Sequence, residues 1–260
     1  MISELAYVHP SAKIGKDVTI EPFAYVEENT VIGDETKIKS GAKILYGARI
    51  GKNCDIHPGA VISGIPQDLK FIGEETTAEV GDNTTVRECA TINRGTKARG
   101  KTTVGNNCLL MAYSHIAHDC EVKNNVIIGN ATQVAGEVVV EDFAILSGGC
   151  LVHQFVKIGS HVMIQGGSKI SKDVPPYITA AREPLVFSGL NTIGLRRRGF
   201  SNEQIREIQE VYRYMYQNGM NNSDACDAIE ADLPITEERD VILYFVRNSP
   251  RGIIKGYSTK

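Results

Sequence analysis

Residues 104–128 read VGNNCLLMAYSHIAHDCEVKNNVII, and every sixth residue of this stretch is aliphatic. The same phase runs through residues 8–170, where only Asp68, Glu74 and Ala98 break it. A period of six fits neither an α-helix, with about 3.6 residues per turn, nor an ordinary strand, with a period of two. It is typical of a β-helix of hexapeptide repeats, in which each repeat forms one short strand and one turn.

A small residue follows most of these aliphatic residues by four positions. The column includes four cysteines, Cys54, Cys108, Cys120 and Cys150. One aliphatic and one small side chain per hexad fill the interior of a narrow triangular prism, with three hexads in each coil. A coil then takes 18 residues, and residues 18 positions apart should stack about 4.8 Å apart, like paired strands. We therefore predict a mainly β fold, a parallel β-helix, whose buried cysteines fill the core in a reducing compartment.

Two stretches leave the repeat, at about residues 64–79 and 97–103. A long loop in so regular a scaffold is usually functional or contacts another subunit. We place the end of the β-helix domain, residues 1–176, at Pro175 and Pro176, because prolines cannot continue a strand ladder. Residues 177–260 are then a linker, irregular up to about residue 200, and a C-terminal helical domain.

Helical periodicity replaces the hexad repeat in this last part of the chain. Ser201 and Gln204 form a capping box that opens a helix to about residue 218. Ser223 can cap a second helix through residue 233, and Thr236 a third. We expect a small helical bundle over the C-terminal end of the prism.

Composition excludes several classes of protein. The 260 residues carry a net charge of −3, so there is no basic excess that would favour nucleic acid. No apolar run approaches the length of a membrane span, and no basic and apolar leader opens the chain. No CxxC pair is present to suggest a zinc cluster. We expect a cytoplasmic protein with no integral membrane segment.

Two of the six histidines lie in a segment whose residues could take part in catalysis. His115 and His118 point outward on either side of the inward Ile116, and Asp119 follows the second of them. An outward imidazole beside a carboxylate is suited to general-base catalysis. The other reading is a pair of solvated histidines on the surface of a coil.

The 18-residue spacing adds two further groups to this segment. Gly136 lies one coil after His118 and Gln154 lies two coils after it, with His153 beside Gln154. A glycine there admits a substrate closely and offers its N–H to a developing oxyanion. The column thus contains a base, a charge partner and an oxyanion donor.

A groove for an apolar chain is expected on another outward column. Met163 lies one coil above Ile145, and Gly166 lies one coil above Gly148. Methionine has a flexible side chain and glycine has none, so these columns leave room along the prism. We therefore expect Met163 and Gly166 to line an acyl-chain groove that favours long chains.

Six short strings together resemble one family, the UDP-N-acetylglucosamine acyltransferases that begin lipid A biosynthesis. They are Gln67–Lys70, Arg94–Thr96, His115–Cys120, Val152–Phe155, Asp173–Tyr177 and Gly194–Phe200. The resemblance implies a left-handed parallel β-helix and a homotrimer with sites between subunits. The implied reaction moves an (R)-3-hydroxyacyl chain from acyl carrier protein to the 3-hydroxyl of the sugar of UDP-N-acetylglucosamine.

The same resemblance implies a role for each site residue. His118 would be the general base, Asp119 its orienting carboxylate and the Gly136 N–H the oxyanion donor. The remaining residues would bind substrate: Asp68 and Lys70 the sugar, His115 and Gln154 the sugar and diphosphate, and His153, Asn191 and Arg197 the nucleotide. No metal or other cofactor is implied, because a thioester is already activated.

Some features of the sequence leave alternatives open. The run Arg196–Arg198 fits the phosphates of UDP, the acidic surface of acyl carrier protein or a solvated charge cluster. Asn93, Ile193 and Glu137 stand where the family often has other residues. Glu137 should stack on Asp119 and raise the pKa of one of the two carboxyls, unless its side chain turns to solvent.

Other functions compete with this reading. The N-acyltransferase of the same pathway has a globular domain before its hexads, which here begin at Val8. A zinc carbonic anhydrase of this fold needs a histidine pair separated by four residues, and the chain has none. A scaffold without catalysis would turn over no thioester. The acceptor could present a 3-hydroxyl or a 3-amino group.

Overall fold

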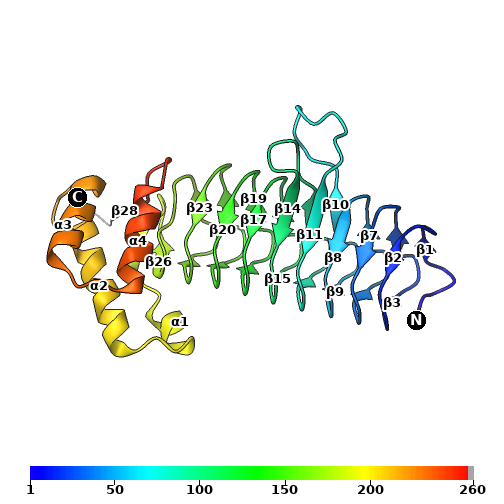
Figure 1. The fold of residues 1–260 in the computed structure, drawn as a ribbon, viewed down its shortest axis with the longest axis horizontal. Helices are drawn as coiled ribbons and strands as arrows, with labels where there is room; N and C mark the ends of the chain where they lie inside the picture. The colour runs from blue at the N-terminus through cyan, green and yellow to red at the C-terminus, as the bar shows by residue number, and fades with distance from the viewer. Residues whose placement is uncertain (257–260) are drawn as a thin grey trace.

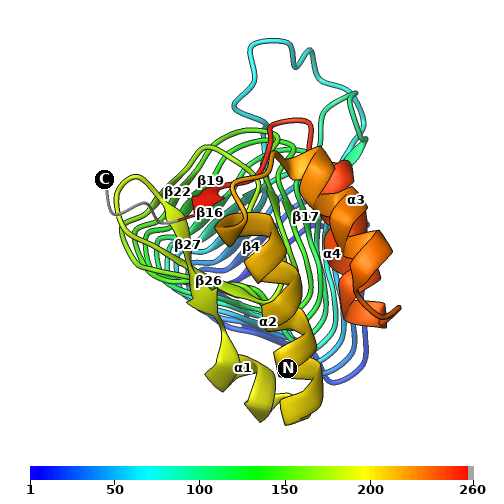
Figure 2. The ribbon, with the colours of Figure 1, turned by 90° about the vertical axis from the view of Figure 1, so that its left-hand side faces the viewer.

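A computed structural model describes residues 1–256 as an elongated prism of short strands with helices at one end (Figure 1). Most strands are two residues long, and each pairs in parallel with a strand one coil away. The predicted hexapeptide β-helix is therefore confirmed. Viewed along the prism in Figure 2, successive coils lie almost on top of one another.

The strands of residues 1–256 form three sheets, one for each face of the prism. Sheet 1 consists of β1 (Tyr7–Val8), β4 (Tyr25–Val26), β7 (Lys43–Ile44), β10 (Val61–Gly64), β13 (Thr91–Asn93), β16 (His115–Ile116), β19 (Gln133–Val134), β22 (Leu151–Val152) and β25 (Lys169–Ile170). Sheet 2 consists of β2 (Lys13–Ile14), β5 (Val31–Ile32), β8 (Ala48–Ile50), β11 (Thr77–Val80), β14 (Lys101–Val104), β17 (Glu121–Val122), β20 (Val139–Val140) and β23 (Lys157–Ile158). Sheet 3 consists of β3 (Thr19–Ile20), β6 (Lys37–Ile38), β9 (Asp55–Ile56), β12 (Thr85–Val86), β15 (Leu109–Leu110), β18 (Ile127–Ile128), β21 (Ile145–Leu146), β24 (Met163–Ile164), β26 (Ile178–Ala181), β27 (Val186–Leu190) and β28 (Lys255–Gly256).

Stacked aliphatic residues form the core of the prism. Ile116 pairs with Val134, Val134 with Val152 and Val152 with Ile170, and all four are buried. The small column is buried beside them, and its thiols donate to backbone oxygens, as Cys120 does to the Ala135 carbonyl at 3.1 Å. The interior thus has room for one aliphatic and one small side chain per hexad.

The two loops lie at residues 65–76 and 94–100, not at the predicted 64–79 and 97–103, because residues 77–79 and 101–103 belong to β11 and β14. Both loops project from neighbouring coils, as Figures 1 and 2 show. Ile62 pairs with Ile92, and Ile92 pairs with Ile116, so the loops lengthen their coils by 12 and 6 residues. Whole multiples of the repeat leave its phase unchanged, which explains why the hexad frame survives both interruptions.

The strand ladder does not end at the two prolines, which corrects the predicted boundary at residue 176. Val174 still bridges to Ile158, and β26 pairs in parallel with β24. Pro175 and Pro176 fall in the turn between these pairings, where no strand N–H is required. The next strand, β27, runs antiparallel to β26, so the link after residue 176 is a hairpin rather than an irregular segment.

Four helices follow in the described part of the chain, α1 (Thr192–Arg197), α2 (Asn202–Gln217), α3 (Asn222–Asp232) and α4 (Glu237–Arg247). The capping box at Ser201 and the cap at Thr236 are confirmed. The predicted cap at Ser223 is wrong, because Asn221 accepts from the Asp224 N–H and its amide bonds the Asp224 carboxylate.

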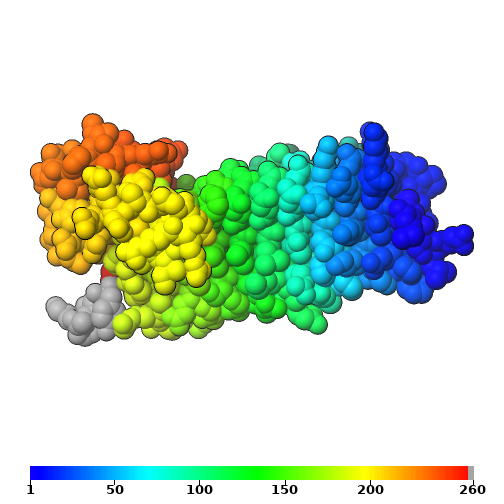
Figure 3. Space-filling view, turned by 90° about the horizontal axis from the view of Figure 1, so that it is seen from below, coloured from blue at the N-terminus to red at the C-terminus, as the bar shows by residue number. Residues whose placement is uncertain are grey.

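The helices cover the C-terminal end of the prism, and Figure 3 shows that the α1–α2 region (yellow) extends along the last coils. The Tyr212 hydroxyl donates to the Pro176 carbonyl at 2.6 Å, which ties α2 to the prism. Within residues 1–256, none of the helices has the length and apolar character needed to cross a membrane.

Candidate active site

His118 and Asp119 lie at the corner between sheets 1 and 2, directly after β16. Nδ1 of His118 lies 2.8 Å from Oδ2 of Asp119. An ionised carboxylate only accepts hydrogen bonds, so Nδ1 carries the proton and Nε2 of the neutral ring has a free lone pair. Nε2 is on the side of the first loop, 4.0 Å from Oδ2 of Asp68.

The Asp119 carboxylate is fully buried and accepts three hydrogen bonds besides the one from His118. Oδ1 accepts from the backbone N–H groups of Thr96 at 2.9 Å and Arg99 at 3.1 Å, and Oδ2 accepts from the Thr96 hydroxyl at 2.6 Å. Burial alone would raise the pKa of Asp119, but the hydrogen bonds from Thr96, His118 and Arg99 bring it below its ordinary value. Asp119 is therefore ionised at neutral pH.

Gly136 lies one coil above His118, as the spacing predicted, and contacts the flat side of the imidazole. A Cβ on Gly136 would lie 2.6 Å from both Cε1 and Nε2 of His118, so only glycine leaves room for the ring. The Gly136 N–H donates to no other group within residues 1–256. It is thus available to a negative charge that develops close to Nε2.

A cleft of about 590 Å³ opens in front of this pair. Five of the predicted site residues line it: His115, His118, Gly136, His153 and Gln154. The prediction had brought these five together from two coil spacings alone. Their juxtaposition in one cleft matches that prediction, while their chemical roles remain predictions.

The cleft also contains polar residues that the prediction missed. Gln133 and Lys169 line it, together with Gln67 from the first loop. Gln133 lies one coil after His115 and Lys169 lies three coils after it, so the spacing that related His118 to Gly136 could have found both.

His115 is a neutral polar group of this cleft. Its Nδ1 lies 2.7 Å from the Thr91 hydroxyl. Burial, and then the nearby His118, lower the pKa of His115 below its ordinary value. At neutral pH it therefore offers hydrogen bonds without charge.

The first loop brings Asp68 to the edge of the site. Its carboxylate lies 4.0 Å from His118 Nε2 and accepts the backbone N–H of Lys70 at 2.9 Å. The Lys70 side chain is exposed. Asn93 anchors the start of the loop, since its amide donates to the Ile65 carbonyl at 3.0 Å.

Glu137 stacks on Asp119 as predicted, with its N–H donating to the His118 carbonyl at 3.0 Å. The like-charge effect predicted for one of the two carboxyls does not dominate at Asp119, whose pKa is lowered. The reason is that the second loop encloses the Asp119 carboxylate and supplies its donors, whereas Glu137 is half-buried. Glu137 is also absent from the residues that line the cleft.

Four predicted site residues lie elsewhere in a single copy of the chain. Met163 is on β24 and Gly166 is at the corner that follows it, on sheet 3. Asn191 caps α1, with its amide donating to the His161 carbonyl at 2.9 Å, and Arg197 is exposed at the end of α1. The structure does not bring these four to the cleft of the same chain.

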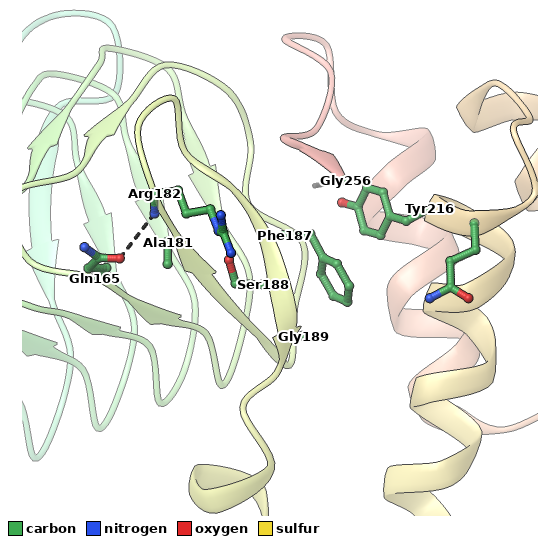
Figure 4. A pocket seen from close by; sticks show the side chains of 9 residues that line it. Gln165, Ala181, Arg182, Phe187, Ser188, Gly189, Tyr216 and Gly256 are labelled. Atoms are coloured by element: carbon green, nitrogen blue, oxygen red, sulfur yellow. Dashed lines mark hydrogen bonds between the residues drawn. The ribbon is translucent and has the colours of Figure 1, made fainter. Parts of the chain in front are cut away.

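A second cleft, of about 600 Å³, lies between the β26–β27 hairpin and α2 (Figure 4). Phe187 and Tyr216 stack along one side, with ring centroids 4.6 Å apart. On the other side the Gln165 side chain accepts the Arg182 N–H at 3.2 Å. Gln165 lies between Met163 and Gly166 in sequence, but neither of these two predicted groove residues lines the cleft.

Cys120 follows Asp119 but is no candidate nucleophile. Its side chain is buried in the prism, and burial raises the pKa of the thiol to about 12. Within residues 1–256, no group of three or more His, Cys, Asp or Glu side chains could hold a metal ion.

Comparison with known proteins identifies the family. Residues 173–254 match the family model described as UDP N-acetylglucosamine O-acyltransferase, domain 2, and residues 11–45, 29–64 and 101–136 match the bacterial transferase hexapeptide model. Two curated relatives are named acyl-[acyl-carrier-protein]–UDP-N-acetylglucosamine O-acyltransferase. The one from Campylobacter concisus is 37% identical over 97% of this chain and 96% of its own, and the one from Thermodesulfovibrio yellowstonii is 39% identical over 98% and 99%.

Solved structures agree with this result. The UDP-N-acetylglucosamine acyltransferase of Bacteroides fragilis is 58% identical to this chain and superposes with a TM-score of 0.97 over 98% of this chain and 100% of its own. The enzyme of Francisella novicida is 39% identical, with a TM-score of 0.95 over 98% of this chain and 94% of its own. The chain therefore belongs to the family of acyl-[acyl-carrier-protein]–UDP-N-acetylglucosamine O-acyltransferases.

Proposed function

We propose that this protein transfers an (R)-3-hydroxyacyl chain from acyl carrier protein to the 3-hydroxyl of the sugar of UDP-N-acetylglucosamine. The observation that carries the proposal is the His118 imidazole, which is held at Nδ1 by a buried carboxylate and presents a bare Nε2 to a polar cleft. Membership of the O-acyltransferase family supports the substrate class.

The geometry suggests one path for the proton. Nε2 of His118 takes the proton of the sugar hydroxyl while the oxygen attacks the thioester carbonyl, which forms the new C–O bond. The resulting imidazolium is stabilised by ionised Asp119 at 2.8 Å. As the tetrahedral intermediate collapses, the C–S bond breaks and the leaving thiolate takes the proton from His118.

The Gly136 N–H is positioned to stabilise the oxyanion of that intermediate. Gly136 lies beside the part of the imidazole that carries Nε2, and no group of the described chain uses its N–H. A donor fixed in place before the reaction needs no reorganisation when the charge develops.

The acceptor sugar would contact residues of the cleft and of the first loop. Asp68 lies close enough to Nε2 to accept from a neighbouring sugar hydroxyl, and Lys70 reaches outward from the same loop. His115 and Gln154 would contact the sugar and diphosphate, and His153 the nucleotide end. One hydrogen bond of His153 has a fixed direction. Its Nδ1 lies 3.0 Å from the Gln154 carbonyl oxygen, which only accepts, so Nδ1 is the donor.

A second copy of the chain would complete the site. Met163, Gly166, Asn191 and Arg197 lie at sheet 3 and α1 and do not line the cleft of their own chain, so we propose that they reach the substrate from a neighbouring prism. We therefore propose a homotrimer with a site in each of its clefts. In it the acyl chain lies along Met163 and Gly166, and Asn191 and Arg197 contact the nucleotide.

The donor side of the reaction implies a protein partner. The helical region exposes Arg196 and Arg197, which suit the acidic surface of acyl carrier protein or the phosphates of UDP. Attraction between oppositely charged surfaces weakens as salt increases. We place the reaction in the cytoplasm as the first step of lipid A biosynthesis, with no metal or other cofactor.

An acyl-transfer assay tests this function. The purified protein would be incubated with UDP-N-acetylglucosamine and a series of (R)-3-hydroxyacyl carrier proteins of increasing chain length, and the nucleotide sugar would be analysed by mass spectrometry. We expect one acyl ester per sugar, with long chains preferred. A parallel reaction with the 3-amino sugar nucleotide distinguishes ester from amide formation. Absence of acyl transfer to either sugar would contradict the proposal.

A further inference from the structure

The second loop, residues 94–100, contributes no residue to the proposed mechanism, yet it makes most of the contacts to Asp119. Thr96 supplies two of the four hydrogen bonds that the carboxylate accepts, one from its N–H and one from its hydroxyl. Arg99 supplies a third through its backbone N–H. Only the fourth bond comes from His118.

The direction of the Thr96 hydroxyl bond is fixed. The same oxygen accepts the N–H of Ala98 at 3.2 Å, so its single proton is free to point to Oδ2 of Asp119, 2.6 Å away. Thr96 is 6% exposed, which leaves little of its surface for water. The hydroxyl is therefore a dedicated donor to this carboxylate.

The loop itself is held rigidly around Thr96. The Thr96 carbonyl accepts the N–H of Gly100 at 2.8 Å, and the Gly95 carbonyl accepts the Thr76 hydroxyl at 2.6 Å. A Cβ on Gly95 would clash with the backbone of Lys101, so the returning chain passes Gly95, the neighbour of Thr96, at a distance that only glycine allows. The position of Thr96 is thus determined by its neighbours on both sides.

The corner one coil later shows what the loop adds. Glu137 has nearly the same backbone conformation as Asp119, with φ values of 60° and 59°. Glu137 is half-buried, whereas Asp119 is fully buried under the loop. The second loop therefore distinguishes the two corners. It closes over Asp119, which can then orient the imidazole of His118, and it leaves Glu137 half-buried.

We infer that Thr96 is a positioning residue for the proposed base. By holding the Asp119 carboxylate in one orientation, it keeps the proton of His118 on Nδ1 and leaves Nε2 bare toward the cleft. The catalytic consequence rests on the proposed function, whereas the effect on the proton position does not.

The test compares two substitutions of Thr96 with a matched control. Thr96→Val removes the hydroxyl donor and keeps the shape of the side chain, and Thr96→Ser keeps the donor. Thr84→Val is the control, because the Thr84 hydroxyl is equally buried and donates to the Gly105 carbonyl at 2.8 Å, without contact with Asp119. The tautomer of His118 is read from its ¹⁵N imidazole resonances, assigned with His118→Ala, and kcat and KM are measured on the same proteins.

We expect Thr96→Val to populate the Nε2-protonated tautomer and to lower kcat about 10- to 100-fold, with little change in KM. This range is the one found when the partners that orient metal-bound histidines are removed. Thr96→Ser and Thr84→Val should keep the wild-type tautomer and a kcat close to wild type, even where they lower stability. An unchanged His118 tautomer in folded Thr96→Val would overturn the inference. A changed tautomer with unchanged kcat would support the inference and instead overturn His118 as the base.

Discussion

Gly136 and His118 stack so closely on consecutive coils that the imidazole fills the space of the side chain that Gly136 lacks. We predict that Gly136→Ala displaces the imidazole. The φ of Gly136 lies outside the left-handed region, so alanine fits the backbone and the chain should fold. A displacement of about 1 Å at a catalytic group can lower kcat about 10²-fold. Steady-state kinetics together with thermal unfolding would check this, and a folded variant with wild-type kcat would show that the ring is not confined by Gly136.

His161 gives the protein a predictable response to acid. Its ring stacks between Phe143 and Tyr177, with centroids 4.8 and 5.7 Å away. Burial, and then the charge of Arg198, lower the pKa of His161 to about 4. An unfolded histidine titrates near about 6.5, so the unfolded chain binds more protons between these two values.

The contribution of His161 to the free energy of unfolding should therefore be fully present above pH ~6.5 and should be lost as the pH decreases toward ~4. His161→Phe keeps a stacked ring without a titrating group and should remove this part of the pH dependence. Denaturant titrations of both proteins between pH 4 and 7.5 measure the difference. Parallel stability curves for the two proteins would mean that His161 binds protons equally well in the folded and unfolded states.

Gly166 provides a test of the acyl-chain groove. A Cβ at this position would lie 3.0 Å from the Gly148 carbonyl oxygen, so a larger side chain would be crowded where we propose that the acyl chain lies. We predict that Gly166→Met shifts donor preference toward shorter acyl chains, because overpacking a fitted site costs about 1–3 kcal/mol. The ratio of kcat/KM between long and short acyl carrier proteins measures the shift. Activity with the shortest donor serves as the internal control, and an unchanged ratio would place the groove elsewhere.

The hexad repeat was enough to predict the prism and part of the site. The interior period defines the register, and the register places Gly136 over His118 because parallel strands stack residue upon residue. The helix caps at Ser201 and Thr236 were also predictable, since each depends on residues within one turn of helix.

Other features depend on contacts that the repeat does not encode. Thr96 reaches the Asp119 carboxylate because of the way the second loop folds back onto the prism. No local sequence pattern predicts that conformation of the loop. The lowered pKa of Asp119 has the same origin, because its donors come from that loop and not from the stacked column. Pro175 and Pro176 predict the end of the ladder, yet the ladder continues past them, because the sequence does not show whether a proline falls in a strand or in a turn.

The turnover of His118→Ala tests the central claim most directly. The variant would be assayed with UDP-N-acetylglucosamine and its preferred (R)-3-hydroxyacyl carrier protein, beside His9→Ala as a control. His9 lies on the surface, where it bonds Ser11 at 2.8 Å. If His118 removes the proton from the sugar hydroxyl, its loss should lower kcat at least about 10²-fold while the protein stays folded. His9→Ala should keep wild-type turnover, and turnover close to wild type in His118→Ala would contradict the account.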